Sequence, residues 1–173
     1  MCIRDRRRLA DKQTRVLLRY KYYEMKNNAQ DFSSLAPEKF KGLKETVGWC
    51  AKAVDSLADR LQFDEFQNDE FDLSEIFLSN NQDILIDSAV LSALISACSF
   101  VYIREDNGYP RLQVIDGSNA TGIIDPVTNL LTEGYAVLER DSMGVVKTEA
   151  YFMAGMTEIY LSLIHISEPT RPE

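Results

Sequence analysis

Histidine is nearly absent from the sequence and cysteine is scarce: the 173 residues include one histidine and three cysteines. An odd, widely spaced set of cysteines gives no disulfide framework. Long apolar runs are also missing, because the longest, residues 84–98, is interrupted by Asp87 and by serines and would span only about 22 Å as a helix, against roughly 30 Å of bilayer core. We therefore expect no membrane-spanning segment, no signal peptide, and a cytosolic, reducing environment.

Acidic residues dominate what is present. With 27 acidic against 19 basic residues the chain carries a net charge of −8, and its 45% hydrophobic content is typical of one globular domain or part of a larger one. This balance argues against a dedicated nucleic-acid-binding domain, because affinity for a phosphate backbone comes mostly from clustered Lys and Arg. Residues 6–26 are the exception, with eight basic and two acidic residues, so the rest of the chain carries −14.

The two ends of the sequence are predicted to come from an adapter. One inverted DNA repeat can encode both, since ATGTGTATAAGAGACAG translates as Met1–Asp5 and its reverse complement translates as residues 161–165. The repeat resembles the transposase-type adapter used in preparing sequencing libraries. We therefore expect residues 1–6 and 161–173 to be adapter-derived and the native segment to be cut at both ends. This removes His165, the only histidine, and with it any Ser/His/Asp or Cys/His arrangement in the native segment.

The basic stretch at residues 7–26 has the periodicity of a helix. Its apolar residues fall on one stripe of an amphipathic helix: Leu9, Val16, Tyr20 and Tyr23. The opposite faces are basic, and we favour a solvated face that neutralises acidic neighbours over an arm that meets an acidic partner or DNA. Residues 27–34 are predicted to form a loop, followed by a short helical turn that Pro37 opens.

Further helices are predicted over residues 43–61, over a short stretch from Asp72 to Asn80, and over residues 83–98. The last of these is apolar on nearly every face, so we expect neighbours to bury it on several sides. Trp49 is expected to pack at the edge of a core.

Six acidic residues and no basic residue lie between Gln62 and Ile76. Their spacing follows neither a calcium loop nor a paired helical metal motif, so we interpret the segment as solvated acidic surface. Three interleaved phenylalanines are expected to anchor it to the core: Phe63, Phe66 and Phe71.

From Ser99 onward the pattern changes to short β runs separated by turn signals. Asp106-Asn107-Gly108 suits a tight hairpin between strands at 100–104 and 111–115. Turns at 125–129 and 142–144 separate the remaining runs, which cover residues 120–124, 130–132, 135–140, 145–153 and 157–160. The sequence thus predicts an α+β fold, with about four helices in residues 7–98 and an antiparallel β meander in residues 99–160.

No residue pattern points to catalysis. The sequence has no glycine-rich phosphate loop, and Cys50 and Cys98 lack partners for a zinc site. Asp116 and Asp125 lie beside predicted turns, where we favour capping of backbone N–H groups over acid–base chemistry. We therefore expect a chain that is not an enzyme and that uses no cofactor or metal.

Four stretches, taken in order, resemble the N-terminal part of tailed-bacteriophage portal proteins, the head-to-tail connector rings of long-tailed phages. They are Arg19–Glu24 in the first helix, Trp49 with Ala53–Leu61 in the second, Ala97–Tyr102 where the fourth helix passes into a strand, and Ile124–Thr128 in the meander. The resemblance covers nearly all of residues 7–160 and implies the wing region of a longer portal chain. Met25 departs from the pattern, since such proteins often place Gly after the tyrosine-rich helix.

The resemblance implies a structural subunit of a closed ring of about twelve copies at one capsid vertex. Duplex DNA passes through such a ring during packaging and ejection, and the terminase large subunit, scaffold and capsid proteins and the head–tail connector dock on it. The terminase supplies the energy. The implied locations are the virion and, during assembly, the host cytoplasm. Net negative charge suits a conduit, because many Lys and Arg contacts to phosphates would hold the moving duplex.

On this resemblance, the basic first helix is expected to pair with the acidic segment of the same or an adjacent subunit. The candidate interface residues are Arg15, Arg19, Tyr22, Asp64, Glu65, Asp69 and Glu70. The alternative is a nucleic-acid-binding or regulatory module that uses the basic helix at 7–26, which a steep loss of affinity with salt would reveal. An enzyme whose catalytic half lies beyond Tyr160 is a third, less favoured interpretation.

Overall fold

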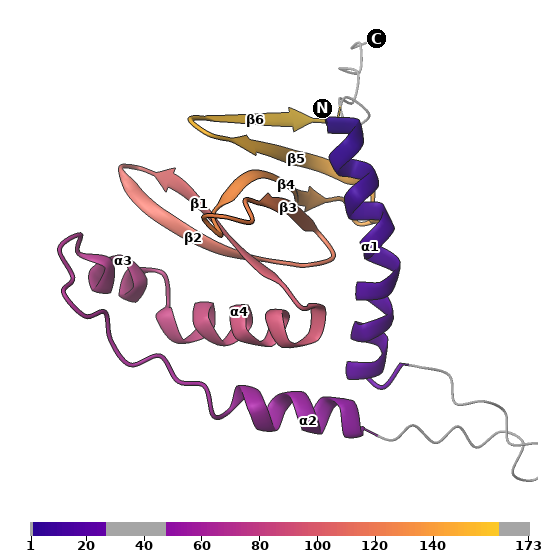
Figure 1. The fold of residues 1–173 in the computed structure, drawn as a ribbon, viewed down its shortest axis with the longest axis horizontal. Coiled ribbons are helices and arrows are strands. Elements are labelled where there is room, and N and C mark those ends of the chain that lie inside the picture. Colours follow the sequence, from indigo (N-terminus) through magenta and orange to yellow (C-terminus); the bar gives the residue numbers. More distant parts are fainter. Residues whose placement is uncertain (1, 27–47, 163–173) are drawn as a thin grey trace, which may run out of the picture. The chain divides into compact units, whose positions relative to one another are not determined.

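The computed structural model describes residues 2–26 and 48–162, and it has the predicted α+β order of helices first and antiparallel strands after (Figure 1). The helices are α1 (Cys2–Tyr23), α2 (Trp49–Ala58), α3 (Leu73–Ser79) and α4 (Gln82–Ser96). The strands are β1 (Ser99–Asp106), β2 (Tyr109–Asp116), β3 (Ala120–Ile124), β4 (Leu131–Arg140), β5 (Val146–Met153) and β6 (Met156–Leu161). The predicted loop at 27–34 and the turn at Pro37 lie outside the described residues. Within the described part of the chain, no helix combines the length and apolarity needed to cross a lipid bilayer.

Two compact units divide the chain. The helical unit, residues 13–118, holds the second half of α1, the other three helices and the two-stranded sheet β1–β2. The sheet unit, residues 1–12 and 119–173, holds the start of α1 and the four-stranded sheet β3–β4–β5–β6. The hairpin β1–β2 thus groups with the helices, whereas the boundary expected from the sequence falls at Cys98.

The later part of the predicted apolar stripe of α1, from Val16 to Tyr23, faces the interior of the helical unit. Val16 is only 3% exposed, and Tyr20 and Tyr23 are partly buried. The Tyr20 hydroxyl lies 3.5 Å from Ser92 Oγ on α4, and the Tyr23 hydroxyl donates to Asp55 on α2 at 2.8 Å. Burial is the main reason that the pKa of Tyr20 is raised. Among the residues of this unit that the structure describes, the other buried apolar side chains are Leu85, Ile95 and Ile115.

The β1–β2 hairpin has the predicted turn. Asp106 pairs with Tyr109, which leaves Asn107 and Gly108 as a two-residue loop with φ of 55° and 81°. Positive φ at both central residues is the type I′ geometry that Asn-Gly favours, because its twist matches that of the strands. Just after β2, the chain passes so close to the end of α4 that a Cβ at Gly117 would lie 2.6 Å from Ser96 Oγ. Only glycine fits there without displacing a neighbour.

The sheet unit is built from consecutive antiparallel strands. Its core joins Leu9 of α1 to side chains of β4 and β5, namely Tyr135, Val137 and Tyr151. The sequence predicted two strands at 130–132 and 135–140, but β4 runs unbroken through Gly134, which pairs with Gly122 on one side and Phe152 on the other. Hydrogen-bonded neighbours on both sides outweigh the weakening that glycine causes in a strand.

Residues expected to come from the adapter form the start of α1. Arg4 Nη2 lies 2.7 Å from Glu133 Oε2 on β4. Arg6 forms an ion pair with the buried carboxylate of Glu149, which also accepts a hydrogen bond from the Tyr135 hydroxyl. Their origin in an adapter stays a prediction.

Three large side chains expected to be buried are exposed. Trp49 is 79% exposed, so the prediction that it packs at the edge of a core is wrong. It is the first residue of α2, which has no buried residue and ends three residues before the predicted Leu61. Phe71 is 76% exposed, and Ile84 on α4 is 71% exposed, so α4 is not covered on that side.

The acidic segment is anchored by two of its three phenylalanines. The ring centroids of Phe63 and Phe66 lie 4.9 Å apart, and they lie 6.1 and 4.9 Å from that of Phe77 on α3. Phe63 and Phe66 thus hold the segment against α3, which has no buried residue, and their anchoring to the core stays a prediction; for Phe71 the prediction is wrong. Two rings already fill the contact with α3, and the third points outward.

Candidate subunit interface

The outer side of α1 in the helical unit carries a second apolar stripe. Leu18, Tyr22 and Met25 recur at spacings of four and three residues and are 51%, 46% and 50% exposed. Arg15 extends the stripe by three residues, and Arg19 lies beside it; both are exposed. We call these five residues the basic face of α1. Apolar side chains left uncovered on a helix whose other side is already packed are typical of a surface that meets another protein.

The two arginines of this face differ in the contacts that they make within the chain. Arg19 Nη1 donates to the carbonyl oxygen of Ser96 at 3.1 Å. This bond satisfies an otherwise unpaired carbonyl at the C-terminal end of α4, where a cation also complements the helix dipole. Arg15 forms no ion pair among the described residues, so its charge is available to a partner.

The basic face ends in a well-defined helix terminus. Met25 has a left-handed φ of 58°, the Lys26 N–H bonds to the Lys21 carbonyl oxygen at 2.8 Å, and the Met25 N–H bonds to that of Tyr22 at 3.3 Å. This is the Schellman pattern, which usually has glycine at the left-handed position. Met25 therefore has the backbone conformation of the glycine that the portal resemblance leads one to expect there.

The acidic segment, residues 62–76, leads from the end of α2 into the first turn of α3. Asp64, Glu65 and Glu70 are exposed, and the exposed ring of Phe71 follows directly. Asp69 is engaged instead, because its two carboxylate oxygens accept the N–H groups of Leu73 and Ser74, each at 2.7 Å. Hydrogen bonds from Ser74, and then from Leu73, hold the pKa of Asp69 below its usual value. Asp69 thus caps α3, as a carboxylate at a helix N-terminus does.

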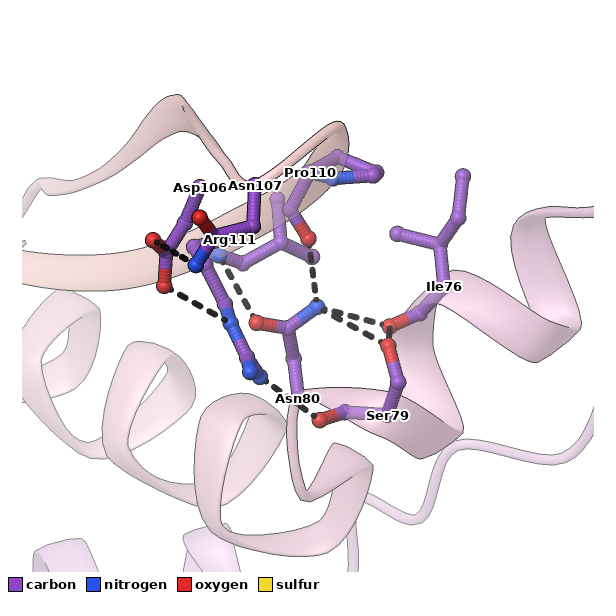
Figure 2. Close-up of polar contacts among 8 residues, drawn as sticks. Ile76, Ser79, Asn80, Asp106, Asn107, Pro110 and Arg111 are labelled. Carbon is purple, nitrogen blue, oxygen red and sulfur yellow. Dashed lines mark hydrogen bonds and ion pairs between the residues drawn. The ribbon is translucent and has the colours of Figure 1, made fainter.

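Asn80 fixes the end of α3, and with it the acidic segment, to the hairpin (Figure 2). Its Nδ2 donates to the carbonyl oxygens of Ile76 at 2.8 Å and Pro110 at 3.0 Å, and its Oδ1 accepts the Leu112 N–H at 2.9 Å. Beside it, Arg111 Nη1 donates to the Ser79 carbonyl oxygen at 3.2 Å. One side chain therefore ties the last turn of α3 to β2.

Within one chain the structure does not bring the two groups of predicted interface residues together. No ion pair joins the basic face to the acidic segment among the residues described. In Figure 1 the acidic segment runs from the end of α2 into α3, which joins the N-terminal end of α4, whereas α1 contacts the last turns of α4. The sequence named Arg15, Arg19 and Tyr22 but missed Leu18, Met25 and Phe71. The sequence did contain a signal for the second stripe, because α1 has more apolar residues than one buried stripe requires.

A groove of about 530 Å³ in the helical unit lies between α1, α4 and β2. Its walls include Tyr20, Ile84, Leu91 and Val114, with the carboxylate of Glu24 at its margin. Apolar walls of this kind suit an apolar group more than a reacting one.

The two aspartates weighed for acid–base chemistry both cap turns, as predicted. Asp116 accepts the Ser118 N–H at 2.6 Å, and Asp125 accepts the Val127 N–H and the Thr128 hydroxyl, each at 2.9 Å. The bond from the Val127 N–H is the largest cause of the lowered pKa of Asp125. In the described ranges, no three His, Cys, Asp or Glu side chains are placed to hold a metal ion together.

Among known proteins, no family model matches the chain and no curated protein matches it.

Proposed function

We propose that this chain is part of a structural subunit of a viral portal ring, the channel through which duplex DNA enters and leaves the capsid of a tailed phage. The observation that supports it most is where the four resembling segments fall along the fold. They lie at the end of α1, through α2, at the passage from α4 into β1, and in the turn between β3 and β4. Each is the kind of element that the resemblance implies.

Uncovered surface gives the proposal a second support. A ring subunit needs two surfaces that a monomer leaves open, and the helical unit exposes both the basic face and the acidic segment. The proposed partners are further copies of the chain, the terminase large subunit, scaffold and capsid proteins, the head–tail connector and the passing DNA. The proposed place of action is the capsid vertex, reached by assembly in the host cytoplasm.

The DNA on either side of the codons for residues 7–160 tests this function. We expect one longer open reading frame, a terminase gene before it and a scaffold or capsid gene after it. The product of that longer frame should form rings that electron microscopy resolves. A frame surrounded by genes unrelated to virus assembly, together with a full-length product that stays monomeric, would contradict the proposal.

A further inference from the structure

We propose that the basic face of α1 binds the acidic segment of a second copy, so that copies join head to tail. The position, charge and exposed apolar side chains of the two surfaces support this contact. Its closure into a ring rests on the proposed function.

The two surfaces lie on different elements inside the helical unit, at opposite ends of α4. α4 has 15 residues and is therefore about 22 Å long. Arg19 and Tyr20 of α1 contact Ser96 and Ser92 in its last turns, whereas α3 joins its first turn (Figure 1). The contacts of the basic face with α4 thus lie at the end opposite to α3, and among the described residues no ion pair joins the basic face to the acidic segment of its own chain.

The basic face and the acidic segment carry opposite charges. The stretch from Gln62 to Ile76 has six acidic residues and no basic one, and the basic face has Arg15 and Arg19 without an acid. Two basic faces repel each other, as do two acidic segments, so a symmetric pairing of like surfaces is disfavoured. Opposite surfaces attract, and complementary charge fixes which surfaces meet.

Both surfaces also expose large apolar side chains. The basic face exposes Leu18, Tyr22 and Met25, and the acidic segment exposes 76% of Phe71. Interfaces between proteins combine such apolar and aromatic anchors with a charged rim. Each surface therefore combines exposed apolar side chains with charged ones, and the charges of the two surfaces are opposite in sign.

Two of the charged residues already form hydrogen bonds within the chain, which leaves the others to form ion pairs with a second copy. Arg19 is bonded to Ser96 and Asp69 caps α3. Arg15 on one side, and Glu65 and Glu70 on the other, form no ion pair among the described residues. We therefore assign the intermolecular ion pairs to Arg15 with Glu65 or Glu70, around a contact between Phe71 and Leu18 or Tyr22.

Sedimentation velocity of the 173-residue chain over a range of concentrations tests the contact. We expect oligomers at low salt that dissociate as salt rises, because exposed charges are screened. Arg15→Glu, and separately Glu65→Lys with Glu70→Lys, should weaken association by more than about tenfold. The matched controls are Arg104→Glu and Glu105→Lys, which reverse exposed charges on β1 outside both surfaces and should leave association unchanged.

Mixing the two defective variants tests the head-to-tail arrangement. The Arg15→Glu chain keeps its acidic segment, and the Glu65→Lys, Glu70→Lys chain keeps its basic face. Within an equal mixture the native pair of charged surfaces and the reversed pair both attract, so association should be restored well above that of either variant alone. Circular dichroism and thermal unfolding of each variant show whether it is folded like the unchanged chain.

A chain that stays monomeric at low salt would overturn the contact, and so would control variants that lose association equally or a mixture in which association is not restored. If the genes around the reading frame still include a terminase, only the contact has failed and the portal function stands. If association behaves as expected without such genes, the contact stands and the portal function fails.

Discussion

Met25 holds a backbone conformation that side chains disfavour. Its φ of 58° costs a residue with a Cβ about 1–2 kcal/mol, of which the greater freedom of glycine in the unfolded chain cancels part. We expect Met25→Gly to raise the free energy of unfolding by about 0.5–1 kcal/mol, measured by urea denaturation. Lys21→Gly, inside α1, is the control and should lower it by about 1 kcal/mol. A loss of stability in Met25→Gly would contradict this account of the helix end.

Asp69 links stability to pH in the acid range. Because its pKa is lowered from 3.8 by Ser74 and then Leu73, its contribution is complete above the pH at which an unfolded aspartate titrates. It is lost as the pH falls through the lower pKa of the folded state. In thermal unfolding from about pH 5 to about pH 2, Asp69→Asn should therefore flatten part of the decline seen in the unchanged chain. Asp64→Asn is the matched control and should leave the profile as it is; a similar effect there would refute the capping role.

At the scale of elements, Asn80 decides where α3 lies. Its amide makes two hydrogen bonds to β2 and one to the Ile76 carbonyl oxygen of α3, so Asn80→Ala leaves a backbone donor and two carbonyl groups without this partner. We expect the free energy of unfolding to fall by about 1–3 kcal/mol and amide exchange in α3 to accelerate. Ser79→Ala, which removes the hydroxyl bond to Ile76 and a 3.4 Å bond from Asn80 but leaves both bonds to β2 in place, should have a smaller effect. Equal effects would show that α3 is held by other contacts.

The elements themselves were largely predictable, and their surroundings were not. A hydrophobic periodicity of 3.6 residues predicted α1, and the Asn107-Gly108 pair predicted the hairpin, because both patterns involve only neighbouring residues. The unbroken β4 was missed because Gly134 reads as a break until the strands on either side are known. Trp49 and Phe71 were misjudged for a related reason. An apolar residue in a sequence indicates a preference for burial, but only the neighbouring elements determine whether anything covers it.

The charged residues of the candidate interface and Tyr22 were predictable, but its other apolar residues were not. The runs of basic and acidic residues are visible in the sequence, so Arg15, Glu65 and Glu70 could be named. The structure adds that Arg19 and Asp69 are engaged within the chain and that Leu18 and Phe71 are exposed. Both facts depend on packing between distant segments, which local patterns do not encode.

For the whole molecule, the balance of charge determines how it meets DNA. The chain carries −8 overall although residues 6–26 are basic, so the net field repels duplex DNA. In fluorescence anisotropy with a labelled duplex, we expect no saturable binding at about 0.15 M salt. A nucleic-acid-binding module would instead bind with an affinity that falls steeply with salt and that Arg15→Glu reduces. Such binding would favour the alternative function over the portal.

The placement of the two surfaces at opposite ends of α4 also bears on how growth stops. A row of copies always keeps one unused surface at its front and one at its rear, whatever its length. Bending the row until its last member meets its first adds one contact without adding a copy, and that contact forms at the high effective concentration of a tethered pair. The angle between neighbours, and not a separate stop signal, would then determine how many copies complete the circle.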